Sequence, residues 1–209
     1  MRTRAVLTGV VVALSAVTLA PTTAHAAPKK PTPPIVLEAA MLVTDIDEEQ
    51  ALRAGNRVIA EGTDRVLIDG LTGAELARVP INPPSSGGGA LSTQGVVYGN
   101  CGSSYIYLRD SAGSKFYFYT GFDLNNSAVD FDWYVNVRGE YSRGADNYSW
   151  EDHGPIAFRD VWTSGNIFST QDIPAGSYYY ARVTSGRAYL ANGGVCTTGY
   201  PSDGRYLYK

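Results

Sequence analysis

The clearest alternation of apolar and polar residues in the chain runs from Phe131 to Arg138. Phe131, Trp133, Val135 and Val137 would share one face of a strand, with the intervening polar residues on the other face. Similar short runs predict further strands over residues 104–109, 115–120, 156–162, 177–184, 187–191 and 205–208. Clusters of Gly, Ser and Asn separate these runs, and those at residues 163–166 and 184–186 are expected to be turns. Short strands at regular spacing favour an antiparallel β-sandwich or barrel over residues 95–209.

A different pattern precedes this β-domain. Asp47 begins a capping box, which predicts a helix over residues 47–60. Two short apolar runs around a turn containing Asp-Gly and Thr-Gly predict a hairpin over residues 65–79. Residues 27–81 are therefore expected to form a small α+β segment. The Pro-, Gly- and Ser-rich run at residues 82–94 is expected to link that segment to the β-domain.

The first residues have the pattern of an export signal. Arg2 and Arg4 precede an uncharged apolar stretch over residues 5–19, which is short for a membrane span. Small residues then stand at the two positions that a signal peptidase recognises, which predicts cleavage after Ala26. Residues 1–26 are thus expected to be a signal peptide, and the mature protein is expected to be secreted, extracellular and soluble.

The charge of the mature chain narrows the classes of partner. Removal of two arginines from 17 basic and 20 acidic residues leaves a net charge of about −5 with His neutral. Nucleic-acid binders are normally basic, so a nucleic-acid partner is disfavoured. A basic stripe for a membrane surface is absent from the sequence, so no membrane partner is expected after cleavage.

Cys101 and Cys196 are the two cysteines of the chain. In an exported protein two cysteines most often pair, because the exterior is oxidising. A bridge between them would join the start of the β-domain to its end. The chain-entropy model assigns about 4–5 kcal/mol to closing a loop of this size.

The cysteines also belong to a frame of glycines and aromatic residues. This frame consists of Tyr98-Gly99-Asn100-Cys101-Gly102-Ser103-Ser104-Tyr105-Ile106, Thr120-Gly121-Phe122, Asp132-Trp133 and Gly193-Gly194-Val195-Cys196 before Pro201. Over residues 95–208 the chain resembles small uncharacterised secreted proteins of high-GC Gram-positive bacteria. The resemblance implies a β-domain with one disulfide, and it transfers no activity and no catalytic residue.

Tyrosine is the most distinctive residue of the β-domain, which contains all 15 tyrosines of the chain. Three pairs occupy alternate positions of predicted strands, so each pair shares a face: Tyr105 and Tyr107, Tyr117 and Tyr119, and Tyr178 and Tyr180. In the first two strands the intervening residues are Ile, Leu and Phe, which are expected to form the core. An outward row of tyrosines suits stacking on sugars or contact with proteins. The alternative is that tyrosine serves here only as a good strand former.

The sequence gives less support to a catalytic or metal-binding function. His153 is the one histidine left after signal cleavage, which excludes a His-rich zinc site, and residues 151–155 around it read as a loop. Asp130 and Asp132 lie on one side of a strand, where paired carboxylates could hydrolyse a glycoside. The oxygen-rich segment 123–132 could alternatively bind calcium. No catalytic residue, metal ligand or cofactor is assigned.

The expected function is a non-catalytic binding or structural role through the tyrosine-rich sheet face, with an unidentified extracellular polymer or protein as ligand. One alternative is a secreted hydrolase that uses carboxylates or His153. A further alternative is a secreted enzyme inhibitor with a protruding loop over residues 141–155. The sequence does not indicate an oligomeric state.

Overall fold

The structure is a computed structural model that describes residues 35–82, 100–111, 115–141, 144–169 and 177–206. All of these belong to one compact unit, residues 33–209. The predicted signal peptide and nearly all of the predicted linker lie outside the described residues. No helix in the described part of the chain is long and apolar enough to cross a membrane.

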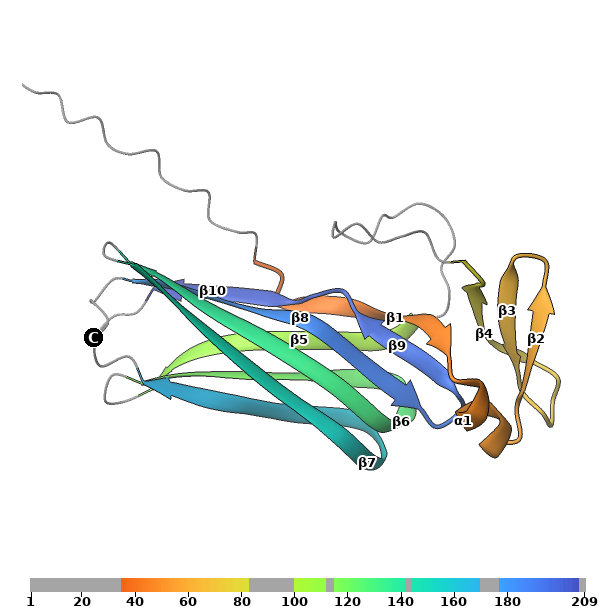
Figure 1. Cartoon of the computed structure of the whole chain (residues 1–209). Helices are drawn as coiled ribbons and strands as arrows, with labels where there is room; N and C mark the ends of the chain where they lie inside the picture. Colours follow the sequence, from red (N-terminus) through yellow and green to blue (C-terminus); the bar gives the residue numbers. More distant parts are fainter. Residues whose placement is uncertain (1–34, 83–99, 112–114, 142–143, 170–176, 207–209) are drawn as a thin grey trace, which may run out of the picture. The chain divides into compact units, whose positions relative to one another are not determined.

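Antiparallel strands make up most of this unit (Figure 1). The elements are β1 Glu38–Ile46, α1 Glu48–Arg53, β2 Arg57–Glu61, β3 Asp64–Ile68, β4 Glu75–Pro80, β5 Asn100–Ser111, β6 Lys115–Tyr141, β7 Gly144–Ser169, β8 Tyr178–Leu190, β9 Gly194–Thr198 and β10 Ser202–Tyr206. The large sheet has the order β10-β8-β9-β1-β5-β6-β7, and the small sheet has the order β2-β3-β4. The predicted fold class, a mainly antiparallel β-protein with one disulfide and a small helical segment before it, is confirmed.

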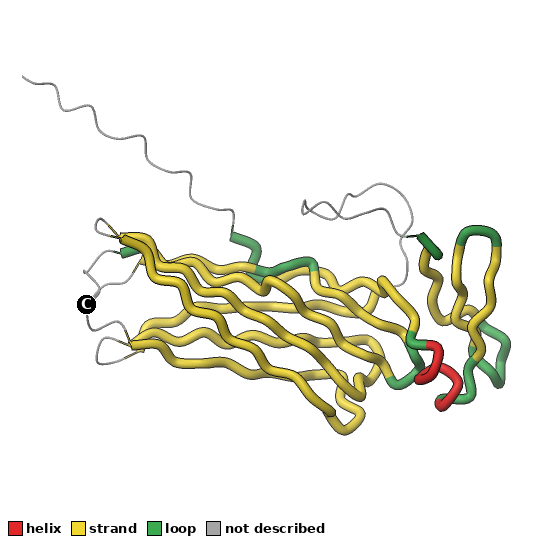
Figure 2. The backbone as a smooth tube through the Cα atoms, viewed as in Figure 1, coloured by secondary structure: helices red, strands yellow, loops and turns green. Residues whose placement is uncertain are grey.

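Strand β6 does not run straight but folds back on itself (Figure 2). The indole Nε1 of Trp133 donates a hydrogen bond of 3.0 Å to the Thr120 hydroxyl. In a straight strand these two residues would lie about 43 Å apart. The fold-back coincides with two shifts of the pairing register with β7, between Asp123 and Ala128 and between Ala128 and Asp130. Such bulges bend a strand sharply.

The fold-back of β6 closes the large sheet into a ring. The first half of β6 pairs with β5, and the second half pairs with β8. Because β8, β9, β1 and β5 are also joined in series, the hydrogen-bonded ladder returns to β6. β7 pairs with both halves of β6, so the two strands form one ribbon that bends together.

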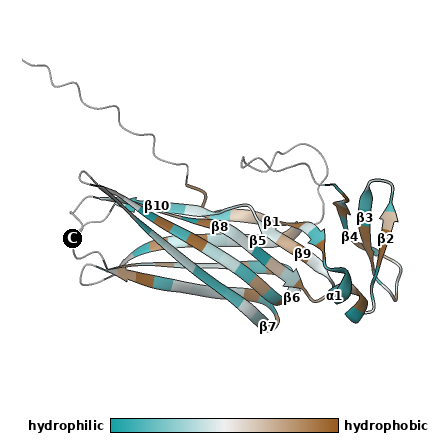
Figure 3. Ribbon diagram, in the orientation of Figure 1, coloured by the Kyte–Doolittle hydropathy of each residue, from teal (hydrophilic) through white to brown (hydrophobic). Residues whose placement is uncertain are grey.

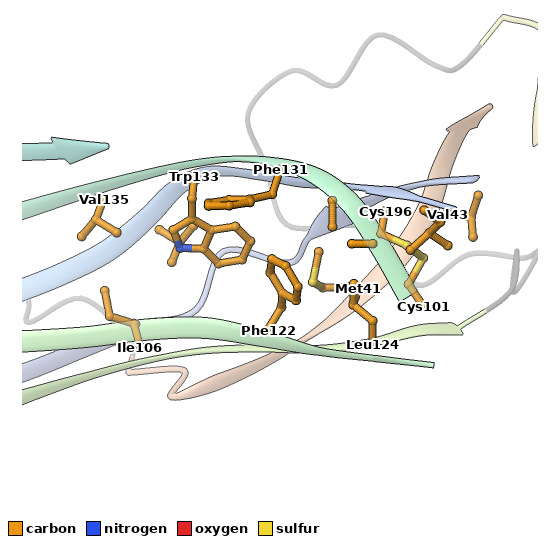
Figure 4. Packing of buried hydrophobic residues seen from close by; sticks show 14 of the residues in the cluster. Met41, Val43, Cys101, Ile106, Phe122, Leu124, Phe131, Trp133, Val135 and Cys196 are labelled. Carbon is orange, nitrogen blue, oxygen red and sulfur yellow. A yellow bond between two sulfur atoms is a disulfide. The ribbon is translucent and has the colours of Figure 1, made fainter. Parts of the chain in front are cut away.

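The core lies between the two halves of this ribbon (Figure 4). Phe122 comes from the first half of β6, while Phe131 and Trp133 come from the second half, and all three are buried. Phe131 and Trp133 point inward, as the alternation of residues 131–138 predicts. Figure 3 shows apolar and polar residues alternating along the long strands. Near one end of this core Cys101 and Cys196 form the predicted disulfide, with Cα atoms 6.0 Å apart.

The predicted boundary between residues 27–81 and 95–209 does not separate two sheets. β1, from the N-terminal segment, pairs with β5 on one side and with β9 on the other. Met41 and Ile46 of β1 are buried in the same core as the residues of β6. This placement of β1 depends on pairing between strands that are far apart in the sequence. The local periodicity of a sequence does not predict such pairing.

The predicted helix begins where expected but ends early. The Asp47 carboxylate accepts a hydrogen bond of 2.9 Å from the Gln50 amide, which confirms the N-cap. The helix stops at Arg53, because Gly55 adopts a left-handed φ of +78° that ends it. The following apolar residues belong to β2, so the prediction of a helix to residue 60 is wrong. The predicted hairpin is confirmed by the pairing of β3 with β4.

Three segments predicted as turns or loops are strands. Residues 163–166 and 144–155 lie within β7, and residues 184–186 lie within β8. In residues 163–166 and 184–186 glycine marks close packing rather than a turn. A Cβ on Gly186 would lie 2.6 Å from the Trp133 ring, for example. The protruding loop expected over residues 141–155 is therefore a strand paired with β6 over its described length.

Candidate functional site: the tyrosine cluster

Four of the six predicted tyrosines lie on the outer face of β5 and the first half of β6. Tyr107 stands opposite Tyr119, and Tyr105 stands opposite Gly121. The residues between them, Ile106 and Phe118 among them, are completely buried on the inner face. The expectation that the phenylalanines form the core and the tyrosines face outward thus agrees with the structure of these two strands.

Three of these rings contact one another and are named here the tyrosine cluster: Tyr105, Tyr107 and Tyr119. The ring centroids of Tyr105 and Tyr107 lie 5.6 Å apart, and those of Tyr107 and Tyr119 lie 5.0 Å apart. The interplanar angles are 37° and 31°, and the angle between Tyr105 and Tyr119 is 64°. The rings therefore form a contoured apolar surface rather than a flat platform.

A cation lies over the tyrosine cluster. The guanidinium carbon of Arg109 is 5.2 Å from the Tyr107 ring centroid and 5.6 Å from that of Tyr119. Arg109 also donates a hydrogen bond of 3.4 Å to the Tyr119 hydroxyl. A guanidinium this close to aromatic rings is attracted by their negative faces. The same guanidinium lies 3.9 Å from the buried carboxylate of Asp203, so the cluster combines apolar rings with an ion-paired arginine.

Hydrogen bonds to neighbouring strands fix two of the three rings. The Tyr107 hydroxyl donates to Glu38 of β1 at 2.7 Å. This hydrogen bond, together with desolvation, raises the pKa of Tyr107 to about 12. The Tyr105 hydroxyl is hydrogen-bonded to the Thr163 hydroxyl of β7. The cluster is consequently tied across four neighbouring strands of the sheet.

The apolar surface continues beyond the cluster toward β7. Tyr117 is half-buried and stands opposite Ile167 of β7 in the ladder. Ile167 is 60% exposed and Val161, on the same strand, is 48% exposed. The outer face of the β5–β6–β7 region therefore carries more exposed apolar surface than the tyrosines alone provide.

Tyr178 and Tyr180 belong to a different part of the sheet. They lie on β8, where Tyr180 stands opposite Arg138 in the second half of β6. The Tyr178 ring packs on Tyr206 with centroids 5.0 Å apart, and its hydroxyl is buried without a hydrogen-bond partner. Burial raises the pKa of Tyr178. The structure thus divides the six predicted tyrosines into two groups that do not form one surface.

The residues considered for hydrolysis gather on the exposed face of the second half of β6. Asp132 stands opposite His153 of β7 and accepts a hydrogen bond of 2.7 Å from the Tyr189 hydroxyl. Burial, followed by this hydrogen bond, raises the pKa of Tyr189. His153 and Asp130 are both exposed. Exposed groups on an open sheet lack the enclosed cleft in which catalytic residues usually lie.

A surface depression of about 520 Å³ lies on the same part of the sheet. Its lining includes one carboxylate, Glu151, together with Tyr134, Asn136 and Thr184. Two converging carboxylates, which glycoside hydrolysis needs, are therefore not assembled in it. Within the described residues, no group of three or more His, Cys, Asp and Glu side chains is arranged to hold a metal ion.

The sequence pattern identified the rings of the cluster but missed the residues that fix them. Glu38 and Thr163 lie on strands whose register with β5 and β6 is set by long-range pairing. Of the residues around the rings, Arg109 was predictable from the sequence, because it continues the outward alternation of Tyr105 and Tyr107.

Comparison of the chain with protein-family models, curated proteins and solved structures found no match.

Proposed function

We propose that this protein is a secreted, non-catalytic module that binds an extracellular ligand through the tyrosine cluster. The observation that carries the proposal is the position of Arg109 over Tyr107 and Tyr119 on the outer face of a sheet whose inner face is packed core. Tyrosine and arginine are the residue types enriched at recognition surfaces and at their energetic centres. Secretion is supported by the predicted export signal and by the disulfide, which needs an oxidising compartment.

The rigidity of the cluster supports a binding role. The hydrogen bonds of Tyr107 to Glu38 and of Tyr105 to Thr163 hold two rings in place before any ligand arrives. A surface that is already ordered loses less conformational entropy when a ligand binds. Tyrosine adds to this advantage because it offers a large contact area with few rotatable bonds.

The tilt of the rings favours a protein ligand over a polysaccharide. Stacking on a flat sugar chain is best served by rings that lie nearly in one plane. The rings of Tyr105 and Tyr119 are instead inclined by 64°. Such a contoured surface suits the side chains of a protein, and an aromatic contact would complement the guanidinium of Arg109, whose charge is already paired with Asp203.

A pair of matched variants tests the proposal. In Tyr119→Leu the stacked partner of both Tyr107 and Arg109 is removed from the surface, while the buried face of β6 is unchanged. In the control, Tyr180→Leu, a tyrosine is removed from β8 instead. The wild type and both variants would be immobilised and exposed to secreted proteins of the source organism, and separately mixed with insoluble cell wall, chitin and cellulose.

The expected result is a secreted protein captured by the wild type and by Tyr180→Leu, and bound about tenfold or more weakly by Tyr119→Leu. Circular dichroism and thermal unfolding confirm that both variants fold. Capture that is equal for the two variants would place the binding surface elsewhere. Retention on a polysaccharide that is lost only in Tyr119→Leu would keep the cluster as the site and change the ligand class.

A further inference from the structure

In the part of the chain that the structure describes, the second half of β7 is a sheet edge. β7 pairs with β6, and no other described strand pairs with it. An edge strand presents a row of free backbone N–H and C=O groups to which another strand can add. Val161 and Ile167 flank this row on the outer face, and they are 48% and 60% exposed.

The two halves of β7 differ in the features that protect edges. The first half contains Glu151, Asp152 and Pro155, and charges and proline are the usual means of preventing strand addition. From Val161 to Ser169 the strand has neither a charged residue nor a proline. The open edge is therefore confined to the second half.

The hydrogen bonds show which backbone groups face outward. The Ile167 amide donates to the side-chain oxygen of Asn166 at 2.8 Å, which places this amide on the side of the strand away from its ladder with β6. In an antiparallel ladder the direction of the backbone groups alternates with each residue. Val161, Thr163 and Gly165 therefore present their N–H and C=O groups to the same free side as Ile167.

We propose that a second copy of this chain pairs antiparallel with the second half of β7, about a two-fold axis at Ser164. Val161 of each copy then faces Ile167 of the other, and Thr163 faces Gly165. The segment is self-complementary in this register, since exposed apolar residues meet each other twice and no like charges are juxtaposed. A closed two-fold interface of this kind ends in a dimer rather than a fibre.

The neighbouring registers are less favourable. A shift of the axis by one residue to Gly165 places Val161 opposite Ser169. A shift to Thr163 places Ile167 opposite Arg159. Both shifts lose the two apolar cross-strand pairs, which stabilise a sheet relative to alanine pairs. Apolar matching therefore selects the register centred on Ser164.

The dimer would also bring two tyrosine clusters onto one continuous sheet face. Thr163 is hydrogen-bonded to Tyr105, and Ile167 stands opposite Tyr117, so β7 lies directly beside the cluster. The pairing of two β7 strands does not depend on the proposed ligand, because none of the backbone groups that would pair belongs to a residue of the tyrosine cluster. The two proposals are consequently testable separately.

Cysteine cross-linking tests the register. Residues that face each other in a hydrogen-bonded antiparallel pair have Cα atoms about 5.5 Å apart, within reach of a disulfide. The double variant Val161→Cys/Ile167→Cys should therefore form a covalent dimer in mild oxidant, as seen on a non-reducing gel. Val161→Cys and Ile167→Cys alone place identical residues about 20 Å apart and should stay uncoupled. The native cysteines do not interfere, because they are already bonded to each other.

Sedimentation of the full mature chain over a concentration series tests the interface itself. Ile167→Lys should abolish the dimer, whereas Leu71→Lys, at a fully exposed turn residue, should leave it intact. Asn166→Ala removes the internal acceptor of the Ile167 amide and should tighten the dimer several-fold. A wild type that sediments as a monomer at every concentration overturns the proposal. So does equal cross-linking of the single and double cysteine variants, or a weaker dimer in Asn166→Ala.

Discussion

At the scale of single residues, the hydrogen bond between Trp133 and Thr120 holds the two halves of β6 together. Both residues are fully buried, and the Thr120 hydroxyl accepts from the indole at 3.0 Å while donating to the Tyr105 carbonyl at 2.7 Å. Thr120→Val leaves the indole N–H without a partner. We expect the free energy of unfolding to fall by about 1–3 kcal/mol.

Urea unfolding of a double-mutant cycle measures this coupling. In Trp133→Phe the indole donor is already absent, so the added cost of Thr120→Val should shrink to the loss of its bond to Tyr105. An equal cost of Thr120→Val in both backgrounds would show that the indole bond does not stabilise the fold-back.

Tyr107 makes the free energy of unfolding depend on pH in the alkaline range. Its folded-state pKa is about 12, raised from 10.0 first by its hydrogen bond to Glu38. The stabilisation is therefore complete below pH 10 and is lost as the pH rises toward 12. Glu38→Gln should bring the pKa of Tyr107 closer to its ordinary value and flatten this part of the stability curve. NMR titration of ring-labelled tyrosine, assigned with Tyr107→Phe, measures the pKa, and an unchanged value in Glu38→Gln would contradict the assignment.

Sequence reasoning succeeded at this scale wherever the alternation of a single strand decides the outcome. The inward direction of Phe116 and Phe118, and hence the outward direction of Tyr117 and Tyr119, follows from period two alone. It failed for Glu38, because the contact of this residue with Tyr107 depends on how β1 is placed beside β5.

At the scale of elements, the predicted strands 115–120 and 131–138 correspond to the two halves of β6, but the sequence pattern does not show that they form one folded-back strand. The bend between Asp123 and Asp130 contains Asn125, Asn126 and Ser127 but no glycine. Conversely, Gly186 lies in the continuous strand β8. The physical reason is that bulges bend a strand through a register shift, whereas these glycines make room for neighbouring groups.

Gly186 tests this explanation. A Cβ at this position would lie 2.6 Å from Cζ3 of Trp133, so Gly186→Ala overpacks the core and should cost about 1–3 kcal/mol. Gly194→Ala serves as the matched control, because its nearest neighbour is the flexible end of Leu190 at 3.3 Å. Thermal unfolding compares the two, and equal melting temperatures would show that space at Gly186 is not limiting.

At the scale of the whole molecule, β1 connects the N-terminal segment to the β-domain, which the sequence pattern predicts as two separate parts. It fills the position between β5 and β9, and these two strands carry the cysteines of the disulfide. Cys101 itself is an extra residue at a bulge, since Met41 faces Gly102 and the next residue of β1 faces Asn100. The disulfide therefore links the two strands that flank β1, and the ring is complete only when β1 is present.

This arrangement predicts that residues 95–209 do not fold alone. Without β1 the facing edges of β5 and β9 lose their ladder partners, and the core loses Met41, Val43 and Ile46. A synthetic peptide of residues 35–47 supplies the missing strand and should restore the near-ultraviolet circular dichroism of the fragment. The same peptide with Val43→Asp should fail, because it buries a charge beside Cys196. Cooperative unfolding of the fragment without any peptide would instead show that the β-domain is complete from residue 95, and that β1 only covers its edge.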